Sequence, residues 1–81
     1  MASDNKTSEP SGPLSLEFGA TIRARRRQIG LSQEELALSV GTNRRVIGRL
    51  ERGIGTVRLE IALRAAHALG LSAVPRDDAE R

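Results

Sequence analysis

The sequence "LSQEELALSVGTNRRVIGRLERG", Leu31 to Gly53, carries the clearest structural pattern of this chain. Its apolar residues repeat at the three- and four-residue intervals of one helix face. The first set is Leu36, Ala37 and Val40, and the second set is Val46, Ile47 and Leu50. The stretch therefore predicts two short helices, each with a single inner face.

Local signals mark where these two helices begin and end. Ser32 to Glu35 reads "SQEE", a capping box in which the serine hydroxyl accepts from the backbone three residues on and the Glu35 carboxylate accepts from the backbone of Ser32. Gly41 stops the first helix, and Asn43 is a favourable N-cap for the second. Two short helices joined by a turn of about three residues make a helix-turn-helix.

Two further helices flank this pair. The segment 15–28 carries a helical stripe that ends at Gly30, and its apolar residues are Phe18, Ile22 and Ile29. Thr56 is placed to cap a fourth helix that Gly70 closes. The inner residues of that helix are predicted to be Leu59, Ala62, Leu63, Ala66 and Leu69. The next segment, "LSAV" at 71–74, reads as an edge strand or an extended tail.

The chain is long enough for one domain with a modest core. Of its 81 residues, 1–13 are polar and predict a mobile tail, 14–74 form the domain, and 75–81 form a charged tail. Phe18 is the single aromatic residue, so the core is thin and dimerisation is a plausible source of further stability. The expected fold class is all-α, with four to five helices around one core and the short C-terminal strand as an option.

The charges are distributed unevenly. The net charge is +3, but segment 14–74 contains ten arginines and five glutamates, so it carries +5. Arginine supplies planar, forked donors that match phosphates and guanine edges. The surface is therefore either an ordinary solvated basic surface or a phosphate-binding face, and composition alone does not separate the two.

Residues that the sequence lacks exclude several function classes. It has no Cys and one His, His67, which excludes disulfides, thiolate chemistry and zinc fingers built on Cys and His. It contains no apolar run of membrane-spanning length and no signal-peptide pattern, so we expect a soluble, cytoplasmic protein with no membrane partner. No Ser, His and acidic residues are spaced as a catalytic set, and no phosphate-cradling loop occurs. We expect no catalytic residue, no cofactor and no metal.

The helix that begins after Asn43 crowds positive charge onto its outer face. On a helical wheel Arg44, Arg45 and Arg49 lie opposite the core residues. Adjacent arginines repel each other, and those in the first turn oppose the helix dipole. An anionic partner explains this loss of local stability better than a solvated surface does. Gly48 lies among these arginines, where it either lets the backbone approach a DNA groove or is a tolerated weak position.

The same stretch resembles the helix-turn-helix of XRE/Cro-type repressors, and the resemblance extends from about Phe18 to Leu71. The features that carry it are "SQEELA", Gly41, Ile47 with Leu50, and the "ERG" that follows. It implies a compact lambda-repressor-like domain that binds double-stranded DNA in the major groove. Within the family, "TVRLEIALRAAHALGL" followed by "SAVPRDD" is similar to HipB-like antitoxins, which repress their own operon and bind a kinase-like toxin.

The resemblance also implies roles for individual residues. Positions matching Arg44, Arg45 and Arg49 read base edges, and arginine there favours guanine through bidentate contacts. The positions that match phosphate contacts are those of Gln33, Asn43 and Arg52. Arg23 and Arg27 share an outer face of the first helix that could also lie along phosphates. The matching pair in phage repressors implies an internal ion pair between Arg26 and Glu51, and the alternative is two separate surface charges.

The sequence thus favours a transcriptional repressor that binds a pseudo-palindromic operator as a homodimer, with the antitoxin of a HipBA-type pair as the leading role. The alternatives are a stand-alone phage-type repressor, a restriction–modification controller, and a protein-interaction adaptor that reuses the fold. The dimer is expected to form through the C-terminal strand or the fourth helix. Leu38 and Ile61 lie off the core faces and could mark a partner surface, while Arg25 and His67 are expected at ordinary solvated positions.

Overall fold

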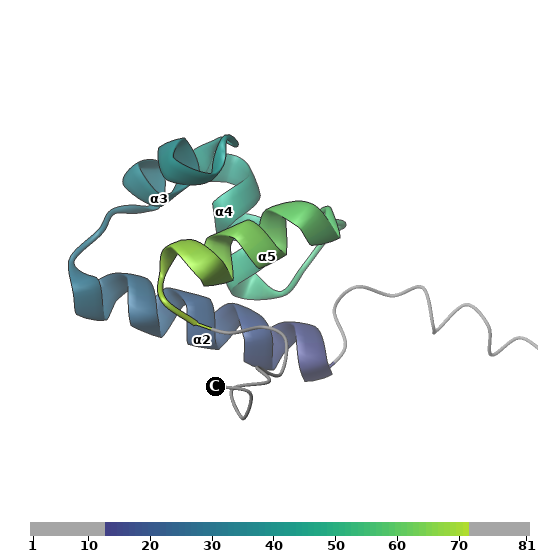
Figure 1. Ribbon diagram of the computed structural model, residues 1–81. Helices are drawn as coiled ribbons and strands as arrows, with labels where there is room; N and C mark the ends of the chain where they lie inside the picture. The colour runs from purple at the N-terminus through teal and green to yellow at the C-terminus, as the bar shows by residue number, and fades with distance from the viewer. Residues whose placement is uncertain (1–12, 72–81) are drawn as a thin grey trace, which may run out of the picture.

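Four helices make up the part of the chain that the structure describes, residues 13–71 of a computed structural model. In chain order they are α2 (Pro13–Ile29), α3 (Gln33–Val40), α4 (Arg44–Arg52) and α5 (Leu59–Ala68) (Figure 1). This arrangement confirms the all-α helix-turn-helix fold. Residues 72–74 of the optional edge strand 71–74 lie outside the described residues, as do residues 1–12 of the tail expected at 1–13 and the whole tail expected at 75–81.

The helix-turn-helix is formed by α3 and α4, and its predicted caps are present. The Ser32 hydroxyl accepts from the backbone of Glu35 at 3.0 Å, and the Glu35 carboxylate accepts from the backbone of Ser32 at 2.7 Å. Gly41 ends α3 with a φ of 79°, a left-handed conformation that glycine adopts without strain. The Asn43 side chain accepts from the backbone N–H of Val46 at 3.0 Å and so begins α4.

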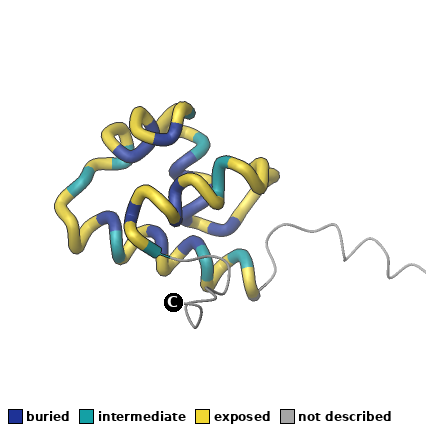
Figure 2. Tube along the Cα trace, viewed as in Figure 1, coloured by how far each residue is buried: buried dark blue, intermediate teal, exposed yellow. Residues whose placement is uncertain are grey.

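The core lies where the four helices meet. α4 packs against both α2 and α3, and α5 packs against α3. Figure 2 shows the buried positions turned toward the middle of the molecule. The buried apolar residues are Ile22, Leu36, Ala37, Val40, Ile47, Leu50, Ala65, Ala66 and Leu69. None of the described helices is both long and apolar enough to cross a membrane.

Both ends of α2 differ from the prediction. The helix begins at Pro13, inside the expected tail, because the fixed φ of proline suits the first helical position. At its other end Ile29, which was predicted to face the core, is 46% exposed. The chain turns at Gly30, and Leu31 rather than Ile29 packs against the core.

The prediction for α5 was wrong in its start and in part of its inner face. Thr56 does not cap it: the helix begins at Leu59, and the N-cap residue, Arg58, makes no side-chain hydrogen bond to it. Leu59 and Leu63 are exposed, whereas Ala65, which the pattern left out, is fully buried. The alanines let α5 approach α3 closely, so the bulkier leucines of its first turns lie at the edge of the contact.

α2 and α4 approach each other through glycine. A Cβ atom at Gly19 would lie within 3.0 Å of the carbonyl oxygens of Leu50 and Glu51. Gly53, which has a φ of 67°, lies so close to α2 that a Cβ atom would be 2.8 Å from the carbonyl oxygen of Ser15. The backbones of the two helices therefore touch, and this contact sets the position of α4.

Candidate nucleic-acid interface

The outer surface of α4 carries arginine without acid. Arg44, Arg45 and Arg49 are exposed, while Ile47 and Leu50 of the same helix are buried. None of the three arginines forms an ion pair with another residue in the described range 13–71. The charge on this surface is therefore available to an anionic partner.

The single acid of α4 points inward and is neutralised. Glu51 and Arg26 of α2 are buried, with 6% and 9% of their surfaces exposed. The Arg26 guanidinium donates from Nε to Glu51 Oε2 at 2.6 Å and from a terminal nitrogen to Oε1 at 3.1 Å, which makes the pair bidentate. The remaining terminal nitrogen of Arg26 donates to the carbonyl oxygen of Leu31 at 2.8 Å. The internal ion pair is thus present, and the alternative of two surface charges is wrong.

Gln33 joins this pair from the first turn of α3. Its side-chain nitrogen Nε2 donates to Glu51 Oε1 at 3.1 Å. The carboxylate of Glu51, a residue of α4, therefore accepts hydrogen bonds from side chains of both α2 and α3. Because Nε2 is engaged, we expect the backbone N–H groups at the start of α3, rather than this amide nitrogen, to be the donors available to a phosphate.

Gly48 is buried, although the helical wheel places it at the centre of the exposed surface of α4. The side chains of Gln33 and Arg52 cover it: a Cβ atom at Gly48 would lie 3.9 Å from Gln33 Nε2 and 3.8 Å from a terminal nitrogen of Arg52. The helical wheel treats α4 as an isolated helix. In the structure the start of α3 lies beside α4, and the side chain of Arg52 reaches back along α4. Two residues predicted to contact phosphate therefore converge over this glycine.

A basic depression connects α2, α3 and α4. It is open to solvent, has a volume of about 690 Å³, and is lined by Arg23, Arg26, Arg27, Ser32, Gln33, Glu34 and Arg44. It brings three of the predicted phosphate contacts, Arg23, Arg27 and Gln33, next to a predicted base contact, Arg44. Asn43 lies at the same end of α4, and since its side-chain oxygen caps the helix, its amide nitrogen is the group left for a phosphate.

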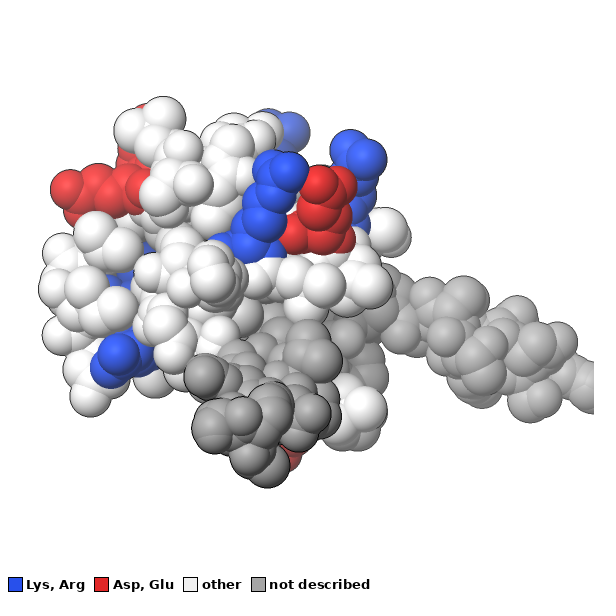
Figure 3. Space-filling model, viewed as in Figure 1, with Lys and Arg blue, Asp and Glu red and all other residues white. Residues whose placement is uncertain are grey.

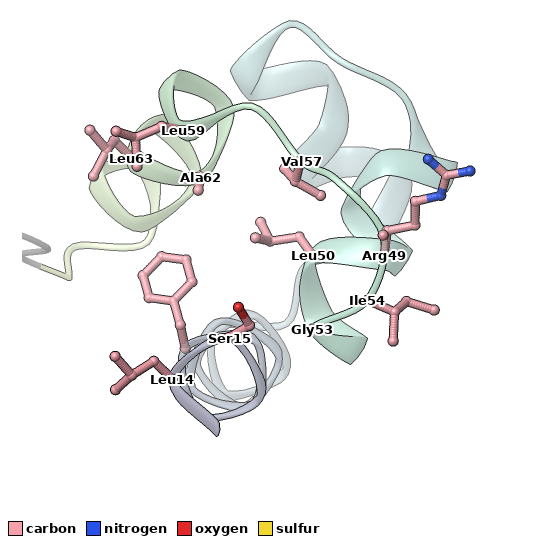
Figure 4. Close-up of a pocket in the computed structure, with 12 residues that line it drawn as sticks. Leu14, Ser15, Arg49, Leu50, Gly53, Ile54, Val57, Leu59, Ala62 and Leu63 are labelled. Carbon is pink, nitrogen blue, oxygen red and sulfur yellow. The ribbon is translucent and has the colours of Figure 1, made fainter. Parts of the chain in front are cut away.

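Arg49 lies at the other end of the arginine surface. Its stem packs over the segment after α4, where a Cβ atom at Gly55 would be 3.3 Å from Arg49 Cδ. Figure 4 shows its guanidinium pointing away from an apolar pocket that the stem borders. The three predicted base contacts are thus spread along the whole exposed length of α4.

Two arginines have structural partners that the sequence did not reveal. Arg25, expected at a solvated position, donates from Nε to the carbonyl oxygen of Leu69 at the end of α5, at 3.0 Å. Arg64 donates to the carbonyl oxygen of Val40 at the end of α3, at 3.4 Å. Carbonyls in the last turn of a helix lack intrahelical donors and attract cations. His67, in contrast, is exposed as expected.

Comparison with known proteins finds relatives over most of the chain. The sequence model of the family HTH_3, helix-turn-helix, matches residues 22–74. An HTH-type transcriptional regulator from Methanothermobacter thermautotrophicus, named as uncharacterised, is 49% identical over 49 residues, which are 60% of this chain and 71% of the relative. The segment 22–74 contains all of α3, α4 and α5, so it includes every arginine of α4.

Two solved structures have a similar fold. The clp gene regulator ClgR from Corynebacterium glutamicum is 33% identical with a TM-score of 0.67, and the match covers 78% of this chain and 67% of that one. The restriction-modification controller protein C.AhdI from Aeromonas hydrophila is 40% identical with a TM-score of 0.63, covering 70% of this chain and 86% of that one.

Proposed function

The chain belongs to the helix-turn-helix family and is a DNA-binding transcriptional regulator, and we propose that it is a repressor that reads its operator with α4. The observation that carries the proposal is the separation of charge on that helix. Its only acid, Glu51, is buried against Arg26, while all the arginines of its outer surface remain exposed. A helix with one wholly cationic surface fits the major groove of DNA.

In this proposal the arginines of α4 have two kinds of role. Arg44, Arg45 and Arg49 contact base edges, preferring guanine, whose O6 and N7 match the forked guanidinium. Phosphates are contacted on both sides of α4, and these contacts position the helix without reading sequence. The phosphate contacts are Arg23, Arg27, Gln33, Asn43 and Arg52.

Selection of bound sites from a random DNA pool tests the proposal and supplies the operator. We expect a guanine-containing pseudo-palindrome whose half-site centres are about 34 Å apart, one helical turn of DNA. Arg44→Ala, Arg45→Ala and Arg49→Ala should each reduce discrimination at one base pair by about 1–3 kcal/mol. Arg58→Ala is the matched control, because this arginine is exposed at the start of α5, makes no side-chain cap bond there and does not lie on the arginine surface.

Two results would count against these roles. Equal losses on selected and random DNA would show that the arginines of α4 contact phosphates and not bases. Binding that is undetectable even at low salt would favour a protein-interaction adaptor instead, because phosphate contacts are strongest under that condition.

We propose the antitoxin of a toxin–antitoxin pair as the biological role, with the protein acting in the cytoplasm as a homodimer. The similarity of residues 56–78 to HipB-like antitoxins supports it. The test is co-purification with the product of a neighbouring kinase-like gene. The partner surface on this chain includes Leu38, which is exposed next to α5, and Ile61, which is partly buried.

A restriction–modification controller is the second candidate role. The 40% identity to C.AhdI over 70% of this chain favours it. A neighbouring methyltransferase gene, together with operator sites upstream of that gene, would support the controller and count against the antitoxin. Both roles use the same DNA-binding surface.

A further inference from the structure

The turn between α3 and α4 contains a carbonyl group that its own backbone does not satisfy. After α3 ends at Val40, the backbone N–H of Thr42 donates back to the carbonyl oxygen of Ala37 at 2.9 Å and closes the turn. Within the described residues 13–71, no backbone N–H donates to the carbonyl oxygen of Val40. Carbonyl groups in the last turn of a helix need a donor from outside that helix.

Arg64 of α5 supplies this donor. One terminal nitrogen of its guanidinium, Nη1, donates to the carbonyl oxygen of Val40 at 3.4 Å. The same nitrogen lies beside the turn, because a Cβ atom at Gly41 would be 3.7 Å from it. The contact is longer than a typical N–H···O bond, but the guanidinium is charged and lies at the negative end of the α3 dipole. A side chain of α5 therefore contacts the turn that joins the two helices of the helix-turn-helix.

Glu60 orients this guanidinium. Its oxygen Oε2 accepts from the other terminal nitrogen of Arg64 at 2.7 Å, from one helical turn earlier on α5. Figure 3 shows basic and acidic groups together on the face that α5 fronts, most of which is uncharged. Both side chains of the pair are about half exposed, so the ion pair by itself adds little to the free energy of folding. The pair is better explained by the direction that it gives the guanidinium.

α5 is itself held firmly by the rest of the domain. Ala65 and Ala66, which follow Arg64, are fully buried, and α5 packs against α3. The carbonyl oxygen of Leu69, at the end of α5, accepts from Arg25 of α2 at 3.0 Å. Arg64 thus connects the turn of the helix-turn-helix to a helix that is fixed against both α2 and α3.

We infer that Arg64 is a positioning residue for DNA reading, which holds the end of α3 and the turn, and so the start of α4, without contacting DNA. The inference rests on the proposed function, in which α4 reads the bases. Asn43, the cap of α4, follows Val40 by three residues, so a turn that moves takes the start of α4 with it. Base contacts need side chains held to within about 0.5 Å, whereas phosphate contacts carry no sequence information. Loss of Arg64 should therefore lower the preference for the operator more than the affinity for DNA in general.

Two matched arginine variants test this role. Arg64→Met removes the guanidinium and keeps an unbranched stem, and Arg25→Met is the control. Each variant loses one positive charge and one arginine bond to a carbonyl oxygen at a helix end, but the bond of Arg25 lies at the end of α5 and not at the turn. Neither arginine belongs to the apolar core, so both variants keep the fold, which circular dichroism verifies.

Titrations of the full chain with the selected operator and with random DNA give the preference, as the ratio of the two dissociation constants. Arg64→Met should lower this ratio about fivefold, the effect of losing one hydrogen bond of ordinary strength. Arg25→Met should leave the ratio unchanged, although it should lower the Tm at least as much, because its bond is shorter. A purely stabilising role of Arg64 would change the Tm and leave the ratio unchanged, and that result would overturn the inference.

The salt dependence of operator binding separates a positioning residue from a phosphate contact. A side chain that neutralises one phosphate contributes about 0.9 to the slope of log K against log salt. Arg64→Met should have the same slope as the wild type. A slope reduced by about 0.9, with equal losses on operator and random DNA, would make Arg64 a phosphate contact and would overturn the inference.

Hydrogen exchange at the backbone N–H of Thr42 tests the contact without DNA. The protection of this N–H, which donates to Ala37 in the turn, should fall about fivefold further in Arg64→Met than in Arg25→Met. Equal protection in the two variants would show that Arg64 does not hold the turn. A wild type that binds selected and random DNA equally would refute the proposed function, and exchange at Thr42 would still decide whether Arg64 holds the turn. An operator preference that Arg64→Met retains would refute the inference and leave the proposed function standing.

Discussion

Two helical glycines of this domain should respond in opposite ways to the same substitution. Gly19 on α2 faces the backbone of α4, and a Cβ atom there would lie within 3.0 Å of two carbonyl oxygens. Gly48 on α4 is also buried, but a Cβ atom there would meet only side-chain ends, Arg52 at 3.8 Å and Gln33 at 3.9 Å. The first contact is a clash with atoms that cannot rotate aside, and the second is an ordinary van der Waals contact.

The expected magnitudes follow from these contacts. Gly48→Ala gains about 1 kcal/mol of helix stability, and no clash opposes the gain. Gly19→Ala has the same gain, but α2 and α4 must separate, and overpacking of this kind costs about 3 kcal/mol at the upper end of its usual range. The net loss is therefore about 2 kcal/mol. In a domain of this size the Tm should rise by about 4–8 °C for Gly48→Ala and fall by about 8–16 °C for Gly19→Ala.

Thermal unfolding followed by far-UV circular dichroism measures both shifts. All samples need one protein concentration, because any association between copies of the chain makes the Tm depend on it. An unchanged Tm for Gly19→Ala would refute the close approach of α2 and α4. The DNA affinity of Gly48→Ala then decides between the two roles of this glycine. Unchanged affinity indicates a tolerated weak position, and a fall in affinity together with a higher Tm indicates that the backbone approaches a DNA groove.

Three further predictions concern the ion pair, the cap and the phosphate contacts. Glu51→Ala should lower the free energy of unfolding by about 3–5 kcal/mol, because it leaves the buried charge of Arg26 without a partner. The double variant Arg26→Met with Glu51→Leu should recover most of that loss. An unchanged denaturation midpoint for Glu51→Ala would contradict the stabilising role of the pair. Asn43→Ala should cost about 1 kcal/mol by removing the α4 cap, and Asn43→Ser, the control, much less. Replacing Arg23 and Arg27 together by Ala should reduce the slope of log K against log salt by about 2 in DNA titrations, and an unchanged slope would place both arginines off the DNA.

The boundaries of the helix-turn-helix could be predicted because their signals are local. Ser32 with Glu35, Gly41 and Asn43 each act within about one turn of the backbone that they cap. The inner face of α3 follows from spacing alone, as do the buried positions Ile47 and Leu50 of α4. Val46, which the spacing also placed inside, is only partly buried and is not among the residues packed against the core. The cationic outer surface of α4 follows from the same wheel, although the DNA contacts of its arginines remain predictions.

Contacts between helices could not be predicted in the same way. A single sequence carries no signal that Gly19 touches the backbone of α4, because the contact depends on how two helices cross. Gly48 faces outward on the wheel and is buried only because Gln33 of α3 and Arg52 lie over it. Leu59 matches a core position by spacing, yet as the first residue of α5 it is 71% exposed.

The buried ion pair links the stability of the fold to the charge of α4. A buried pair of this kind contributes little net stability, because desolvation offsets most of the attraction between the two charges. The geometry of the pair is better explained by a role in positioning helices. Glu51 accepts from Arg26 of α2 and from Gln33 of α3, so one carboxylate sets the place of both helices relative to α4. An exposed acid at the same position would offset one arginine of the outer surface. Turning Glu51 inward keeps that surface wholly cationic. It also holds the start of α3, where we expect a phosphate, beside the helix that we propose reads the bases.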